Sequence, residues 1–180
     1  MGDTQPRRLE ELLARELLRG LTIVGLGLVQ VTLLITPLGF SVPLLLLITV
    51  CKVLVSVDSP SPERDILRTL RLALYGGITL DLLSATDLGV HILALLLATL
   101  FVMLVTHRLR VEGLFIPLFA MLGASPIYEL TLTLASDSRP TDWLIYSRFI
   151  LLPALFMALI PTLPIYFSLR WLLHRQKEKG

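Results

Sequence analysis

LGVHILALLLATLFVMLVT, residues 88–106, is the stretch that decides the fold class of this 180-residue chain. It contains no Asp, Glu, Lys or Arg, and a basic segment with His107, Arg108 and Arg110 follows it. A helix needs about 20 apolar residues to cross a bilayer, where every backbone polar group must be bonded within the helix. The stretch therefore predicts a transmembrane helix that ends at a basic surface.

The composition of the whole chain agrees with this prediction. Hydrophobic residues make up 54% of the sequence and charged residues only 17%, whereas soluble domains carry about 25% charged residues. So little polar surface could not cover so much apolar side chain in water. At about 20 residues per crossing, the length allows roughly six crossings with short loops and no separate soluble domain. We therefore predict an all-α integral membrane protein.

Other apolar stretches bring the expected number of transmembrane helices to about six. They cover residues 21–40, 42–57, 66–83, 114–134 and 143–173. The proline-rich segment 58–65 and the polar segment 136–140 separate them most clearly, because such residues favour turns over helices. The expected architecture is a transmembrane bundle over residues 21–173, followed by a basic cytoplasmic tail over residues 174–180.

The N-terminal residues 1–20 form an expected amphipathic cytoplasmic helix. Leu9, Leu12, Leu13 and Leu17 fall on one face of it, with mixed charges opposite. Two interpretations stay open: this helix lies on the membrane surface, or it extends the first span into water. We expect no cleaved signal peptide, because the charged region is long and contains acids.

The last apolar stretch, residues 143–173, is too long for one straight crossing and contains Pro153, Pro161 and Pro164. Proline removes a backbone donor and kinks a helix, and neighbouring helices must compensate for the loss. We predict one kinked or tilted helix that continues into the cytoplasm. The alternative is a pair of short re-entrant halves.

The basic residues predict the orientation of the chain. With six spans, every Lys and Arg except Arg139 and Arg148 falls on the same side of the membrane. Cytoplasmic loops of membrane proteins carry an excess of Lys and Arg. Both termini are therefore expected in the cytoplasm.

Asp81 is the main candidate for a functional polar residue, because a carboxylate at the depth of a membrane span is costly unless it is paired or hydrated. One interpretation makes Asp81 a polar anchor inside the bundle. The other makes it a residue near the interface that caps the following turn, since Asp favours local backbone hydrogen bonds.

Glu129 and Arg148 are further charged residues within the predicted spans, and an ion pair between carboxylate and arginine would offset their burial. Such a pair would hold helices together rather than perform chemistry. No nucleophile triad, phosphate-binding loop or metal-binding motif occurs in the sequence. We expect no catalytic residue, no cofactor and no metal site. The single cysteine, Cys51, is expected to pack as a small hydrophobic residue.

Residues 77–91, GITLDLLSATDLGVH, resemble the signature of the rod shape-determining protein MreD family. That signature has the form Gly-x-x-x-Asp-Leu-x-Ser-Gly, followed by a further glycine, a long apolar helix and a basic end. The residues in register are Gly77, Asp81, Leu82, Ser84, Leu88, Gly89 and His91. Ala85 stands where the family often has glycine and would stiffen the turn. Length, six spans and cytoplasmic ends match over essentially the whole chain.

The resemblance implies a non-enzymatic membrane component of the bacterial cell-elongation complex, in the cytoplasmic (inner) membrane. The expected partners are membrane lipids, an MreC-like single-span coiled-coil protein, the RodA–penicillin-binding-protein synthase and MreB, with no nucleic acid. The fold would resemble the substrate-binding subunits of energy-coupling-factor transporters. Asp81 and Gly89 would shape a tight outer turn between the third and fourth spans.

Two other functions compete with this one. A transporter subunit that binds a small molecule would use Asp81, His91, Glu129 and Arg148 to line an outward-facing pocket. The short outer loops offer few aromatic residues to enclose such a ligand. A lipid-modifying membrane enzyme is the third interpretation, and the few polar residues argue against it.

Overall fold

The computed structural model describes residues 5–32, 42–57, 62–84, 87–108, 115–135 and 142–177. Three features of the sequence lie outside the described residues. They are the predicted end of the first span near Phe40, most of the polar segments 58–65 and 136–140, and Ala85.

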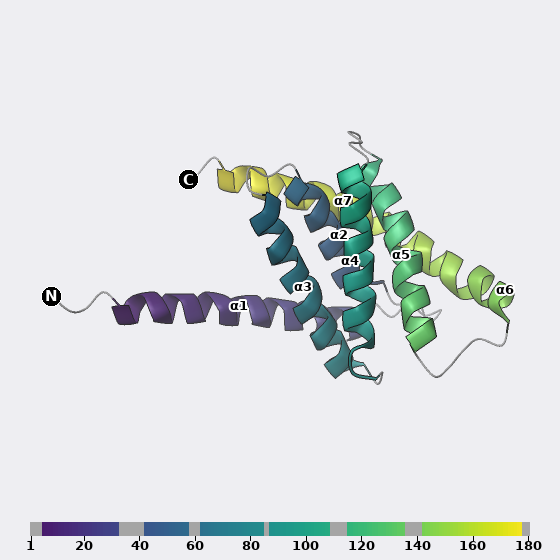
Figure 1. The fold of residues 1–180 in the computed structure, drawn as a ribbon, viewed down its shortest axis with the longest axis horizontal. Helices are drawn as coiled ribbons and strands as arrows, with labels where there is room; N and C mark the ends of the chain where they lie inside the picture. Colours follow the sequence, from purple (N-terminus) through teal and green to yellow (C-terminus); the bar gives the residue numbers. More distant parts are fainter. Residues whose placement is uncertain are drawn as a thin grey trace.

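All regular elements in the described ranges are helices, as predicted. They are α1 (Gln5–Thr32), α2 (Leu44–Val57), α3 (Pro62–Leu83), α4 (Val90–Arg108), α5 (Ile116–Ala135), α6 (Trp143–Tyr146), the π-helical turn η1 (Ser147–Leu151) and α7 (Leu152–Lys177). Figure 1 shows α3, α4 and α5 side by side, with α1 and α7 crossing them and with the start of α1 and the end of α7 on the same side.

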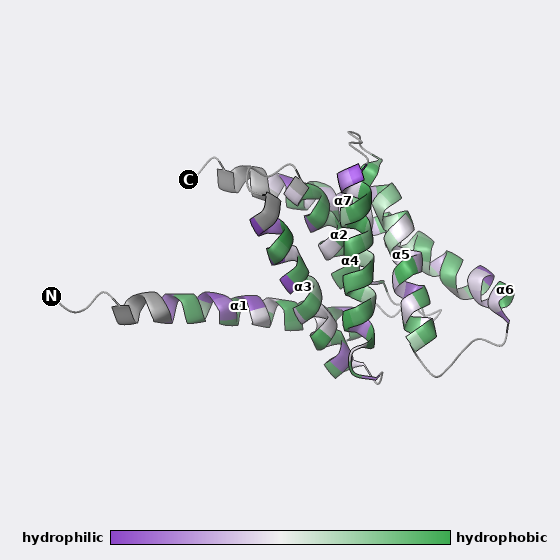
Figure 2. Ribbon diagram, in the orientation of Figure 1, coloured by the Kyte–Doolittle hydropathy of each residue, from purple (hydrophilic) through white to green (hydrophobic). Residues whose placement is uncertain are grey.

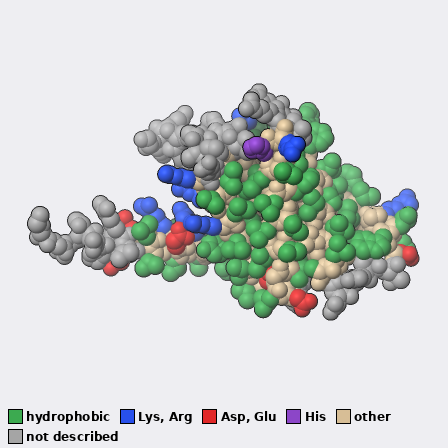
Figure 3. Space-filling view, viewed as in Figure 1, with side chains coloured by type: hydrophobic (Ala, Val, Ile, Leu, Met, Phe, Trp, Pro, Cys, Tyr) green, Lys and Arg blue, Asp and Glu red, His purple; other side chains and the backbone are tan. Residues whose placement is uncertain are grey.

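Within the described residues, three helical segments are long and apolar enough to cross a membrane, as expected for a membrane protein. They are Val90–Arg108, Ile116–Ala135 and Trp143–Trp171. Large apolar side chains cover much of the surface in Figure 3, where a soluble protein would present polar groups. The apolar part of α2 is shorter, and its 14 residues span about 21 Å against the roughly 30 Å of a bilayer core. The total of six spans therefore stays a prediction.

The core of the bundle forms around α2, which contacts α1, α3, α4, α5 and α7. Leu45, Leu46, Leu47 and Val50 on α2 are fully buried. A helix that is apolar on all sides is expected to be surrounded by other helices or by lipid. Cys51 is buried in the same core, in agreement with its predicted packing role.

Small residues are buried on the helices α4, α5 and α7. Three alanine pairs at a spacing of four residues, one each on α4, α5 and α7, are all buried: Ala94, Ala98, Ala120, Ala124, Ala154 and Ala158. Small side chains let helix backbones approach closely in lipid, where packing rather than the hydrophobic effect drives association.

The last apolar stretch forms one continuous helical run over α6, η1 and α7. The π-helical turn Ser147–Leu151 ends two residues before Pro153, and Pro161 and Pro164 lie inside α7. Proline lacks the donor for the regular helical hydrogen bond, and π turns are a common local adjustment within a helix. The structure thus agrees with a single helix and not with two re-entrant halves.

The N-terminal segment and the first apolar stretch form one helix, α1, which continues through Gly20 without a break. Leu12, Leu13, Leu17 and Leu18 on its first half are exposed. The continuous helix fits both interpretations of the amphipathic segment, which therefore stay predictions.

Candidate functional site

The candidate site is the corner between α3 and α4, where the chain turns back on itself. Figure 2 shows hydrophilic residues at this end of α3, next to the largely hydrophobic surfaces of both helices. Asp81 lies two residues before the end of α3, and its side chain is 0% exposed. A buried carboxylate needs hydrogen-bond donors, because its desolvation is otherwise uncompensated.

Three nitrogen atoms at the start of α4 surround the carboxylate of Asp81. The backbone N–H of Gly89 donates to Oδ2 at 2.9 Å, and the backbone N–H of His91 donates to Oδ1 at 2.8 Å. The Nδ1 of His91 lies 3.0 Å from the same Oδ1. Both interpretations of Asp81 thus meet in one structure, since the residue is buried in the bundle and also caps the next helix.

The cap satisfies the first backbone donors of α4. The N–H groups of the first helical turn have no partner within the helix. Here Asp81 accepts from Gly89 and His91, and the carbonyl of Asp87 accepts from Val90 at 3.4 Å. A negative side chain at a helix N-terminus is further stabilised by the helix dipole.

Gly89 makes the geometry of the cap possible. Its φ of +101° lies in the region that side chains with a Cβ rarely adopt. This backbone conformation turns the chain into α4 while the N–H of Gly89 points at Asp81. The glycine of the signature at this position is therefore a backbone requirement.

Gly77 brings α3 and α4 into contact one helical turn before Asp81. A Cβ at Gly77 would lie 2.5 Å from the Cα of Ile92 and 2.8 Å from its backbone nitrogen. The two backbones are packed directly on each other, which only glycine permits. Ser84, the other polar residue of the signature, donates from its hydroxyl to the carbonyl of Leu80 at the end of α3.

His91 connects this corner to α5. Its ring centroid lies 6.3 Å from that of Tyr128, with the planes tilted by 57°. Tyr128 is buried, so a chain of contacts runs from Asp81 on α3 through His91 on α4 to Tyr128 on α5. Sequence reasoning did not select Tyr128, although an isolated tyrosine inside a predicted span is a usable signal.

Glu129 and Arg148 do not form the predicted ion pair. Arg148 is exposed on η1, and the described residues include no ion pair between it and Glu129. Arg148 is exposed, whereas Glu129 on α5 is half-buried. The pocket predicted from Asp81, His91, Glu129 and Arg148 stays a prediction.

A second cap of the same kind was missed by sequence reasoning. The side-chain oxygen of Gln30 on α1 accepts from the backbone N–H of Leu45 at 3.0 Å, at the start of α2. Gln30 is buried. A lone amide in the apolar sequence LVQVT was the available signal, and it has the same physical meaning as Asp81.

Comparison of the chain with family models, with curated proteins and with solved structures found no match.

Proposed function

We propose that this chain is a non-enzymatic membrane scaffold of the bacterial cell-elongation complex. In this role it binds an MreC-like single-span coiled-coil protein and helps to organise peptidoglycan synthesis and cell shape, with RodA, its penicillin-binding protein and MreB as further members of the assembly. The motivation is the resemblance of residues 77–91 to the MreD family.

One observation carries the proposal: Asp81 is fully engaged in holding two helices together. Both of its oxygens accept hydrogen bonds from the start of α4. A carboxylate with these partners stabilises the corner, whereas a substrate-binding carboxylate would keep an oxygen available to its ligand. Gly77 and Gly89 serve the same corner. The residues of the signature thus support a role in presenting helices rather than in chemistry.

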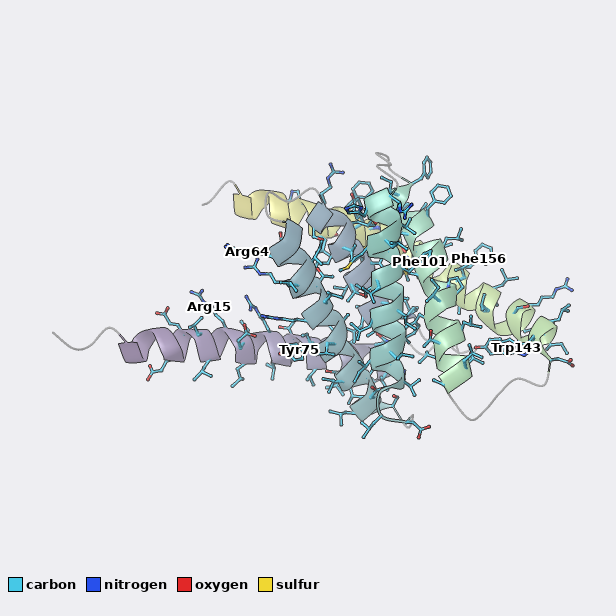
Figure 4. All side chains as sticks on the ribbon, viewed as in Figure 1. Arg15, Arg64, Tyr75, Phe101, Trp143 and Phe156 are labelled. Atoms are coloured by element: carbon cyan, nitrogen blue, oxygen red, sulfur yellow. The ribbon has the colours of Figure 1, made fainter. Side chains whose placement is uncertain are left out.

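The proposal includes six spans in the bacterial inner membrane, both termini in the cytoplasm and a fold like that of energy-coupling-factor substrate-binding subunits. The distribution of charge supports this orientation. Arg19, Lys52 and Arg68, from α1, α2 and α3, are electrostatic neighbours. In Figure 4, Arg15 on α1 and Arg64 on α3 lie on the same flank of the molecule. An excess of cations on one side is the usual mark of the cytoplasmic face.

Cysteine labelling tests the orientation. Cys51 is buried, so the unmodified chain is expected to react little with a membrane-impermeant maleimide in intact cells. Asp87→Cys, in the exposed turn before α4, is expected to react in intact cells. Arg108→Cys, exposed at the far end of α4, is expected to react only after the membrane is permeabilised. The reverse pattern would place the termini outside and contradict the proposal.

Affinity purification tests the function. The tagged chain, extracted from its native cells in gentle detergent, is expected to bring along a single-span coiled-coil protein and peptidoglycan synthases, identified by mass spectrometry. Asp81→Leu should reduce their recovery, because it disrupts the α3–α4 corner. Asp87→Leu, an exposed position in the same turn, is the matched control and should leave recovery unchanged.

The competing function has its own support in Glu129. This residue lies beside Tyr128 on α5, and its carboxylate has no hydrogen bond or ion pair within the described part of the chain. A small ligand could use such a group. Recovery of a transmembrane coupling subunit with paired ATPases would make this chain a small-molecule-binding transporter subunit and overturn the scaffold proposal.

A further inference from the structure

Cations from three helices lie close together on one flank of the bundle. Lys52 is the only charged residue of α2, and it is half-buried. Arg19 on α1 and Arg68 on α3 act on it with charge of the same sign, and Asp65 on α3 acts with the opposite sign. Residues far apart in the sequence thus share one electrostatic environment.

The cations of α1 and α3 lie on particular faces of their helices. Arg64, Arg68 and Arg71 are spaced by four and three residues, which places them on one face of α3. Arg15 and Arg19 are four residues apart on α1. We refer to these five arginines and Lys52 as the basic cluster. Figure 3 shows Lys and Arg side chains gathered over α1 and the adjoining side of the bundle.

Acidic residues neutralise the basic cluster only in part. Arg19 is paired with Glu16, and Arg68 is paired with Asp65 at 3.1 Å. The other members, namely Arg15, Lys52, Arg64 and Arg71, form no ion pair within the described residues. Like charges that are held together by the fold repel each other, and a bound anion relieves this repulsion.

Apolar side chains border the basic cluster, and they indicate what kind of anion it meets. Leu18 on α1, three residues from Arg15, is 64% exposed, and Leu67 on α3 is 58% exposed. Cations next to exposed leucines are typical of the boundary between acyl chains and head groups. A soluble acidic partner would meet the cations in water, without need of these leucines.

We propose that the basic cluster binds the phosphate head group of an anionic phospholipid, with the acyl chains on the exposed leucines of α1 and α3. Lys52 supplies the deepest cation, and Arg19, Arg68 and Arg71 contact the head group from the flanking helices. The inference requires a membrane-embedded chain and does not rest on the cell-elongation proposal.

Lipid binding to the full-length chain in mild detergent tests this proposal. Phosphatidylglycerol and phosphatidylcholine with identical acyl chains are titrated separately, and bound lipid is counted by native mass spectrometry. Phosphatidylglycerol should bind more tightly. Lys52→Met and Arg71→Gln should each weaken the binding of phosphatidylglycerol about fivefold, because one cation near an anionic head group changes the affinity by roughly that factor. Arg71 is exposed and has no ion pair within the described residues, so Arg71→Gln is expected to fold even if Lys52→Met does not fold.

Arg148→Gln is the control, because Arg148 is an exposed arginine on η1, remote in sequence from the cluster. Its affinity for phosphatidylglycerol should equal that of the unmodified chain. Equal affinity for the two lipids, or unchanged binding by Arg71→Gln, would overturn the proposal. Competition by inorganic phosphate at the concentration of the lipid would also overturn it, because the site would then recognise free phosphate.

Discussion

Asp81→Leu is expected to lower the thermal unfolding temperature of the detergent-solubilised chain by about 10 °C. The substitution leaves the buried N–H groups of Gly89 and His91 without their acceptor and removes the partner of the His91 ring. Each unsatisfied buried donor costs roughly 1–3 kcal/mol, so the total is about 3–5 kcal/mol. In a chain of this size, 1 kcal/mol corresponds to roughly 2–4 °C. The fluorescence of Trp143 and Trp171 reports the transition.

Two further variants separate the cap from a general effect of charge. Asp81→Asn keeps one oxygen acceptor and should lose about half as much stability as Asp81→Leu. Asp87→Leu removes an exposed aspartate from the same turn, and its unfolding temperature should stay within about 2 °C of the unmodified chain. Equal unfolding temperatures for Asp81→Leu and Asp87→Leu would mean that the cap contributes nothing to stability.

Gly77→Ala is expected to destabilise the chain by about 1–3 kcal/mol, although alanine is the better helix former. The added Cβ would lie 2.5 Å from the Cα of Ile92, and a backbone atom cannot move aside as a flexible side chain can. The whole of α4 must shift away from α3, which also stretches the hydrogen bonds of Asp81 to Gly89 and His91. Thermal unfolding in the same detergent measures the loss.

The adjacent glycine is the matched control for this prediction. A Cβ at Gly76 would meet only side-chain carbons of Leu45 and Leu95, at 3.5–3.7 Å, which is ordinary van der Waals contact. Gly76→Ala is therefore expected to be neutral or to stabilise by up to about 1 kcal/mol through its helix propensity. If both alanine variants unfold at the same temperature, the close contact of α3 with α4 at Gly77 is not what stabilises this corner.

Much of the fold could be predicted from local sequence. Residues 88–106 predicted α4 within two residues at each end, and the proline-rich last stretch was correctly predicted as one helix. Hydropathy and helix-breaking residues act over a few turns of chain, so a single sequence contains that information. The continuity of α1 through Gly20 was left open, because a lone glycine is tolerated within a helix.

The candidate site was predicted only in part. Asp81 was selected as a carboxylate within a predicted span, and Gly89 and His91 were selected through the resemblance of residues 77–91 to a family signature. Their mutual hydrogen bonds depend on the turn between α3 and α4, which brings residues ten positions apart into contact. The pair of Glu129 with Arg148 was wrong for a related reason, since charge complementarity says nothing about which way each side chain faces.

The sequence by itself determined that this chain is helical and apolar enough for a membrane, since these properties follow from residues that are neighbours along the chain. Only the tertiary structure decided that Asp81 caps α4, that Gln30 caps α2, and that Lys52 lies near Arg19 and Arg68. In each case the partners come from different helices. Their distance is decided by how whole helices pack, which depends on side-chain volume along entire faces rather than on local pattern.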